Sequence, residues 1–228
     1  MGLSKEQDKL KEIITNGIAI DVFDAEESLS LSLYIAGNAE KINDASFGPF
    51  FGSIQRYLDR QLILSTVKIF EEEKGRHKIK SIPSALKLMK NSAEKLEILE
   101  YLDIEKLLGI QANASNKDKN TNKLVADYFL ERIPSSNVKK LKTVRDKRIA
   151  HHEIVIPDSI KSPTYNEIGD LIDFAKDFFG VVGMPYTRTV YKFDDGSYSL
   201  STDANKAKRC LRRLIGKFDD IIVDTFKL

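Results

Sequence analysis

The stretch TYNEIGDLIDFAKDFF, residues 164–179, determines the predicted fold class of this 228-residue chain. Its first four residues, 164–167, have the Thr-x-x-Glu spacing of a capping box, which marks a helix N-terminus. Behind the cap, apolar residues recur three and four positions apart, at Ile168, Leu171, Ile172, Ala175, Phe178 and Phe179. This spacing places them on one face of an α-helix, and that face is stabilised by packing against other helices. The stretch therefore predicts an amphipathic helix within a helical bundle.

The same helical periodicity extends over most of the chain. Pro83 fits the first turn of a helix, where its missing N–H costs nothing. Ser135-Ser136 and Ser201-Thr202-Asp203 offer N-caps for the helices that follow them. In addition to the helix described above, we expect helices over about residues 4–15, 21–43, 48–71, 121–133 and 137–151, one near Pro83 and one after residue 203.

Two segments lack helical periodicity. Residues 112–123 are polar and predict a mobile loop. Residues 187–202 contain strand-forming residues around Asp195-Gly196, which is a turn signal, and predict a small β-hairpin. No linker divides the chain, so residues 1–228 are expected to form one all-α domain, a helical bundle with a hairpin inserted near the C-terminus.

Composition and charge restrict the class of protein. The formal net charge of +2 is too small to indicate a nucleic-acid partner without local clustering. Cys210 is the only cysteine, which excludes an internal disulfide, and its apolar neighbours predict a buried thiol. The N-terminus lacks the apolar region of a signal peptide, and no stretch approaches the ~18 uncharged residues of a membrane span. We therefore expect a cytoplasmic protein with no membrane partner.

The most informative segment for function is VKKLKTVRDKRIAHHE, residues 138–153. Leu141, Val144 and Ile149 can anchor this helix on a core, while six cations lie between residues 139 and 148. Two histidines, His151 and His152, follow the cations. Cations can bind phosphate and histidine titrates near neutral pH, so the segment favours chemistry on a phosphate ligand. P-loop, GxGxxG and HExxH motifs are absent, and neither a metal site nor a cofactor is predicted.

The sequence RDKRIAHHE resembles the motif of the HEPN superfamily, in particular its abortive-infection branch in bacteria. That motif consists of an arginine, a polar residue and, after a few more residues, a histidine, which correspond here to Arg145, Asp146 and His151. The resemblance implies a homodimer whose two motif helices face one cleft. It also implies metal-independent RNA cleavage, in which the 2′-OH attacks the phosphorus and leaves a 2′,3′-cyclic phosphate. Arg145 would then neutralise the phosphate and His151 would transfer a proton, with Asp146 orienting either of them.

The choice of catalytic histidine remains open between two neighbours. The spacing typical of the family favours His151. In an ideal α-helix, His152 returns to within ~20° of the face that carries Arg145, whereas His151 lies ~120° away. We choose His151 and keep His152, with Arg148, as a supporting candidate.

Further basic residues are candidates for binding RNA. On the motif helix these are Lys142, Lys147 and Arg148, and on the last helix Arg209, Arg212 and Arg213. If both basic faces line one groove, RNA binding will depend strongly on salt. Basic residues at a helix end are not expected in the hydrophobic core. Replacing Arg145 or His151 should therefore cost little unfolding free energy.

Other functions are compatible with the same residues. The basic helix could be an ordinary solvated helix end, or the chain could be a catalytically inactive HEPN scaffold that binds RNA or a partner protein. A nucleotide-binding sensor is a third alternative. Besides RNA and a second copy of the chain, a cognate antitoxin or a defence-system protein is a candidate partner.

Overall fold

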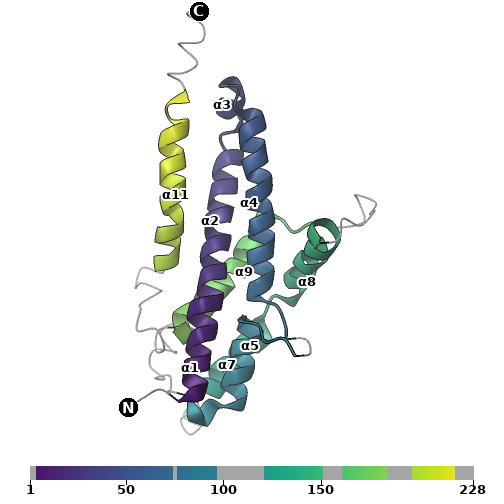
Figure 1. The fold of residues 1–228 in the computed structure, drawn as a ribbon, viewed down its shortest axis with the longest axis vertical. Helices are drawn as coiled ribbons and strands as arrows, with labels where there is room; N and C mark the ends of the chain where they lie inside the picture. The colour runs from purple at the N-terminus through teal and green to yellow at the C-terminus, as the bar shows by residue number, and fades with distance from the viewer. Residues whose placement is uncertain (1–3, 74–75, 97–120, 151–160, 184–196, 219–228) are drawn as a thin grey trace, which may run out of the picture.

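The computed structural model describes residues 4–73, 76–96, 121–150, 161–183 and 197–218. Almost all of these residues are helical, as Figure 1 shows, and the predicted all-α bundle is confirmed. The α-helices are α1 (Lys5–Ile13), α2 (Ala19–Ala36), α3 (Ala39–Asp44), α4 (Gly48–Ile69), α5 (Ile82–Asn91), α7 (Thr121–Arg132), α8 (Ser135–Val144), α9 (Tyr165–Phe178) and α11 (Ser199–Ile215). Shorter helical segments are the π-helical turns η1 (Ile14–Ile18), η4 (Arg145–Ala150) and η6 (Phe179–Gly183), and the 3₁₀ turn η2 (Ala93–Lys95).

Two long helices, α2 and α4, pack side by side and form the centre of the molecule (Figure 1). Helix α11 packs on α2, and α8 contacts α4 from the other side. Helices α5 and α7 pack together at the end of the molecule that holds α1, while α9 contacts α2, α4 and α8. This arrangement places the motif segment, α8 and η4, against α4 and close to the start of α9.

The core is built from the faces that the sequence pattern predicts. All six apolar residues of the predicted α9 stripe are buried, with at most 4% of the side-chain surface exposed. Phe178 packs edge-on against Phe129 of α7, with their ring centroids 5.2 Å apart. A smaller second cluster joins α2, α3, α4 and the end of α11 through Ile35, Ile42, Phe51, Ile215 and Phe218.

Local signals predicted some helix ends correctly. Thr164 and Glu167 form the expected capping box, and Pro83 lies in the first turn of α5. The expected cap at 201–203 is wrong, because α11 already begins at Ser199. The hydroxyl of Tyr198, the N-cap residue, donates to Asp177 of α9, and this tertiary contact ties the start of α11 to α9. Ser135 likewise lies inside its helix, one position after the N-cap residue Pro134.

Several other expectations need correction. The helix predicted over residues 21–43 is divided into α2 and α3 at Gly37. Of the predicted hairpin, residues 187–196 lie outside the described residues, and residues 199–202 form the first turn of α11 instead. Of the predicted loop, residues 112–120 also lie outside the described residues, and residues 121–123 belong to α7. Cys210 is exposed, since α11 rests on α2 through another face. None of the described helices has the length and hydrophobicity needed to cross a membrane.

Candidate active site

The motif segment is a helix whose winding changes at Arg145. Val138, Leu141 and Val144 are buried and anchor α8. From Arg145 to Ala150 the chain continues as the π-helical turn η4, a rare geometry that occurs frequently at functional sites. The angular argument in favour of His152 assumes a regular α-helix after Arg145, and this assumption does not hold over η4. Both His151 and His152 lie outside the described residues.

The guanidinium group of Arg145 is held between two carboxylates. Its Nη1 atom donates to Oε1 of Glu71 at 2.9 Å, and its Nε atom donates to Oδ1 of Asp146 at 2.7 Å. Only 21% of the Arg145 side chain is exposed. Burial alone would lower the pKa of Arg145, but hydrogen bonds and charge attraction from Asp146 and Glu71 outweigh it and raise the pKa. Arg145 is therefore a permanent, oriented cation.

The two carboxylates leave one nitrogen of the guanidinium group, Nη2, without a partner among the described residues. A planar, restrained guanidinium group with a free donor nitrogen can bind a phosphate oxygen in a defined orientation. Of the two residues that Asp146 was expected to orient, Arg145 is in contact with it, and His151 lies outside the described residues.

Sequence reasoning missed Glu71, which lies in the connection between α4 and α5, 74 positions before Arg145. Its backbone carbonyl accepts a hydrogen bond from the hydroxyl of Ser81 at 2.6 Å, which fixes this connection. The only signal in the sequence is that Glu71 begins the acidic run 71–73, which is complementary in charge to the basic motif helix. Helix packing was needed to bring the two together.

The comparison with known proteins gives a family. The family model HEPN_AbiU2, described as AbiU2, matches residues 8–207, a range that includes Arg145 and His151. The chain belongs to this family of HEPN proteins. No curated protein and no solved structure shows a significant match to the chain. The resemblance to the abortive-infection branch of HEPN proteins is thereby confirmed.

The other basic residues of the motif helix in this AbiU2-family chain have distinct surroundings. Arg148 is exposed, and its Nη1 atom donates to the hydroxyl of Ser162 at 3.0 Å, which joins η4 to the segment before α9. Lys142 and Asp146 line a pocket of about 490 Å³ that α8 shares with the ends of α4 and α7. Lys147 is partly exposed. Each of these cations lies within one or two turns of Arg145.

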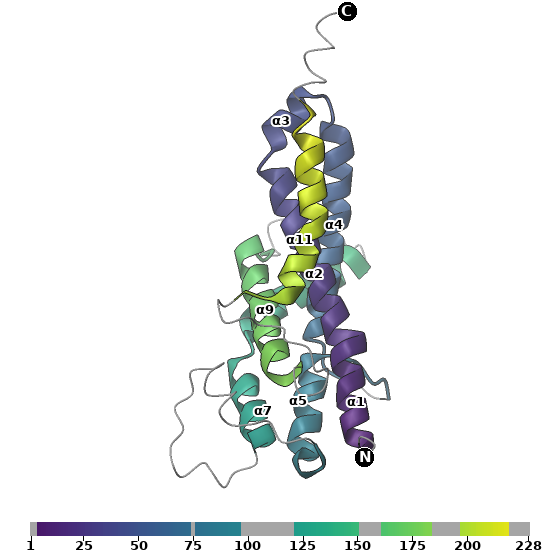
Figure 2. The same ribbon diagram turned by 90° about the vertical axis from the view of Figure 1, so that its left-hand side faces the viewer.

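The basic residues of α11 lie elsewhere. Arg209, Arg212 and Arg213 are exposed, but α2 and α4 separate their helix from α8 (Figures 1 and 2). Within one chain of this AbiU2-family protein, the two basic faces therefore do not line a common groove.

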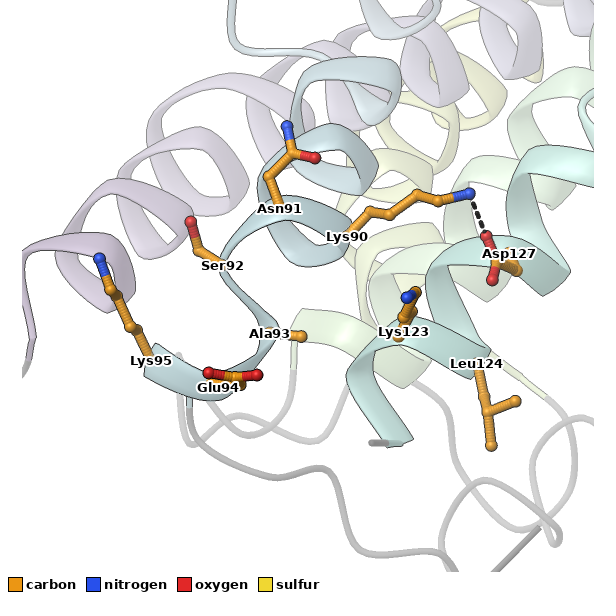
Figure 3. A pocket seen from close by; sticks show the side chains of 9 residues that line it. All are labelled: Lys90, Asn91, Ser92, Ala93, Glu94, Lys95, Lys123, Leu124 and Asp127. Atoms are coloured by element: carbon orange, nitrogen blue, oxygen red, sulfur yellow. Dashed lines mark hydrogen bonds and ion pairs between the residues drawn. The ribbon is translucent and has the colours of Figure 1, made fainter. Parts of the chain in front are cut away.

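Another pocket, of about 620 Å³, lies at the far end of the bundle, between α5, η2 and α7. Figure 3 shows Lys90 of α5 reaching across to Asp127 of α7, and their charged atoms are 2.6 Å apart. None of the predicted site residues lines this pocket. Over the described ranges, no group of three or more His, Cys, Asp or Glu side chains is arranged to hold a metal ion in this AbiU2-family protein.

Proposed function

We propose that this AbiU2-family protein is a metal-independent endoribonuclease that acts as a toxin or phage-defence effector. In the proposed reaction, a base removes the proton of a ribose 2′-OH, and the oxygen attacks the adjacent phosphorus. The bond from phosphorus to the 5′-oxygen then breaks, and an acid protonates that oxygen. The products are a 2′,3′-cyclic phosphate and a 5′-OH.

The observation that carries this proposal is the restrained guanidinium group of Arg145 with its unpaired Nη2 nitrogen. Charge builds up on the nonbridging oxygens as phosphorus becomes pentacoordinate. Donors that are fixed before the reaction stabilise such charge without a cost of reorganisation. Glu71 and Asp146 supply this restraint, because each binds a different nitrogen of the same guanidinium group.

Proton transfer is assigned to His151, with His152 as the neighbouring alternative. A positioned histidine typically contributes 10²–10⁴-fold to such a rate. Arg148 and Lys142 add positive charge on the same helix, and together with Lys147 they bind the flanking phosphates.

A homodimer is part of the proposal. In one chain, Glu71 and Asp146 together neutralise more than the single charge of Arg145. An arginine that is paired with two carboxylates therefore exerts little net electrostatic attraction on an anion. Bringing two motif turns to one cleft adds the charges of Lys147 and Arg148 from both copies around one phosphate, which the two Arg145 side chains orient.

The same charge balance favours a second candidate function. A carboxylate pair that neutralises Arg145 is also what a structural ion-pair network requires. In that case the protein is a catalytically inactive scaffold that binds RNA or a partner protein, such as an antitoxin, through the basic helix.

Incubating the pure protein with RNA in the presence of a metal chelator distinguishes the two. An endoribonuclease gives fragments that end in a 2′,3′-cyclic phosphate, detected by mass spectrometry. Arg145→Lys, which keeps the charge and loses the planar donor fork, should be inactive while remaining folded. If RNA is bound but never cut, the scaffold function is correct.

A further inference from the structure

The pocket of about 490 Å³, where the ends of α4 and α7 meet α8, is a site of its own. Lys139, Lys142 and Thr143 line it from α8, and Asp146 lines it from η4. The three α8 residues are three and four positions apart and therefore share one helix face. Arg145 does not line the pocket, but its partner Asp146 does. The pocket thus shares one residue with the candidate active site.

The floor of this pocket is apolar. Phe70 at the end of α4 is 2% exposed, and Val138 of α8 is 8% exposed. Pro83 of α5 and Ile133 after α7 extend the apolar lining. Because the floor comes from several packed segments, it cannot collapse into the pocket easily. Leu130 of α7 also lines the pocket and is 38% exposed, so part of this apolar surface is open to a large apolar side chain.

Two lysines of the lining carry charge that the described residues do not neutralise. Neither Lys139 nor Lys142 forms an ion pair within the part of the chain that the structure describes. Lys140, which lies between them in sequence, pairs instead with Glu167 of α9. Helix α8 is therefore neutralised on the side that contacts α9 and keeps its positive charge at the pocket. These two lysines can bind carboxylates through charge-assisted hydrogen bonds.

Two carboxylates in the same lining favour a peptide over a nucleic-acid strand. Glu72 is exposed and has no ion-pair partner among the described residues, and half of the Asp146 side chain is exposed. Carboxylates need hydrogen-bond donors, and the phosphate groups of a strand offer only acceptors. A peptide with acidic side chains offers carboxylates to the lysines and backbone N–H donors to Glu72 and Asp146. It therefore complements both charges of the lining.

We propose that this pocket is the docking site of a partner protein, which inserts a peptide segment with one large apolar side chain flanked by acidic residues. The apolar side chain packs on Phe70 and Leu130. The flanking carboxylates bind Lys139 and Lys142, and backbone N–H groups of the segment face Glu72. Docking needs no RNA, so this inference extends beyond the proposed nuclease function and can hold without it.

Docking is coupled to the candidate active site through Asp146. A segment in the pocket lies against the carboxylate whose Oδ1 atom accepts from Nε of Arg145 at 2.7 Å. A shift of this carboxylate changes the orientation of the guanidinium group, so a docked partner slows RNA cleavage. This coupling rests on the proposed nuclease function, whereas the docking itself does not.

The test measures binding of a synthetic probe by fluorescence anisotropy. The probe is an end-blocked, labelled peptide with a central phenylalanine that has aspartate and glutamate residues on both sides. One control peptide carries serine in place of phenylalanine, and a second carries asparagine and glutamine in place of the acids. The protein variants are Leu130→Ser, Lys139→Glu and the control Lys5→Glu, which changes an exposed lysine of α1. Neither Leu130 nor Lys139 belongs to the proposed catalytic or RNA-binding residues.

We expect Leu130→Ser and Lys139→Glu each to bind the probe about tenfold more weakly, because each removes one anchor of the segment. Lys5→Glu should bind normally, and circular dichroism should confirm that all three variants are folded. The serine peptide should bind more weakly than the probe. The peptide without acids should also bind more weakly, and salt should weaken its binding less.

The outcomes decide between a peptide and RNA as the occupant. Equal affinity for the phenylalanine and serine peptides, or unchanged affinities in both variants, would overturn the proposal. A 2′-O-methyl RNA hexanucleotide, which lacks the attacking hydroxyl, should bind Leu130→Ser as it binds the wild type. If this RNA loses affinity as the peptide does, the pocket binds RNA and the proposal fails.

A cleavage assay tests the coupling separately. Saturating probe should slow RNA cleavage by the wild type and leave cleavage by Leu130→Ser unchanged, and equal rates with and without the probe would overturn the coupling. Peptide binding is measured in the absence of RNA, so a failure of docking and a failure of the nuclease function are distinguished.

Discussion

Oε1 of Glu71 lies 2.9 Å from Nη1 of Arg145, although 74 positions separate the two residues in the chain. This ion pair connects the α4–α5 connection to the first residue of the π-helical motif turn. With 21% and 30% of their side chains exposed, the partners are only partly screened by water. Removing the Arg145 side chain should therefore cost about 1–2 kcal/mol of unfolding free energy. This exceeds the small cost expected for a surface cation.

Replacing Glu71 tests whether the pair positions Arg145. Glu71→Ala should lower RNA cleavage about tenfold, because the guanidinium group gains rotational freedom and loses its fixed orientation. Glu71→Gln should retain more activity, since its amide oxygen can still accept from Nη1. Cleavage rates and melting temperatures are measured for both. Glu72→Ala, in the same acidic run, serves as the control. If Glu71→Ala cuts faster than the wild type, the carboxylate competes with the substrate instead of positioning Arg145.

The two motif histidines are distinguished by single substitutions. We expect His151→Ala to lose 10²–10⁴-fold in cleavage rate, because it removes the proposed proton-transfer group. His152→Ala should keep most of the activity. Single-turnover cleavage of one RNA by both variants provides the comparison. The opposite pattern would assign proton transfer to His152, and equal cutting by both would remove the histidines from the mechanism.

Lys176 should make the stability of the fold sensitive to alkaline pH. It is only 7% exposed, and its Nζ atom lies 2.9 Å from Glu26 and 2.7 Å from Asp173. Burial alone would lower the pKa of Lys176, but the two carboxylates outweigh burial and raise it above its ordinary value of 10.5. The stabilisation is therefore complete below about pH 10.5 and is lost as pH rises through the higher pKa of the folded state.

Lys176→Met should cost about 3 kcal/mol of unfolding free energy at neutral pH, because it leaves the largely enclosed carboxylate of Glu26, 15% exposed, without its partner. The difference from wild type should shrink above about pH 10.5. Urea unfolding at neutral and alkaline pH measures both effects. Lys87→Met, at an exposed lysine whose Nζ lies 3.7 Å from Glu73, should show neither. A difference that stays constant up to alkaline pH would contradict this account.

The basic face of α11 should matter only for long RNA. Because α2 and α4 lie between α11 and α8, a short strand at the motif cannot reach Arg209 and Arg213 of the same chain. Arg209→Ala/Arg213→Ala should therefore leave hexanucleotide binding unchanged and reduce the salt dependence of binding for a long transcript. Affinities at several salt concentrations provide the slopes. An equal loss for the hexanucleotide would place this face of α11 at the cleft, supplied by a second copy.

Light scattering at micromolar concentration should give twice the chain mass of 25.8 kDa, as the proposed shared cleft requires.

Two exposed aromatic residues on α4 are candidates for the dimer interface. Phe50 and Tyr57 are seven positions apart, which places them near one another on the helix surface, and they are 60% and 71% exposed. Exposed aromatic rings are typical of protein interfaces. Phe50→Ser/Tyr57→Ser should shift the mass toward the monomer. Ile20→Ser, which changes an apolar residue of α2 that is 53% exposed, should not. A wild-type monomer would rule out the shared cleft.

Local interactions explain which parts of the fold the sequence predicted. The Thr164–Glu167 capping box and the buried α9 stripe depend on contacts within one or two turns, and these can be identified by residue spacing. The motif segment could be recognised for the same reason. Its residues, among them Arg145 and Asp146, follow one another closely in the sequence. The sequence by itself therefore determined the helical class, the positions of most helices and the candidate catalytic arginine.

Only the tertiary structure decided what surrounds these elements. Glu71 reaches Arg145 because α4 and α8 pack together, a contact that residue spacing cannot reveal. Helix α11 begins at Ser199 rather than after residue 203, and Cys210 is exposed, because the contact of Tyr198 with Asp177 and the packing on α2 outweigh local preferences. The π-helical turn after Val144 changes the directions in which the motif side chains point. Contacts between distant segments stabilise these features, so their geometry is determined by the packing of the whole bundle.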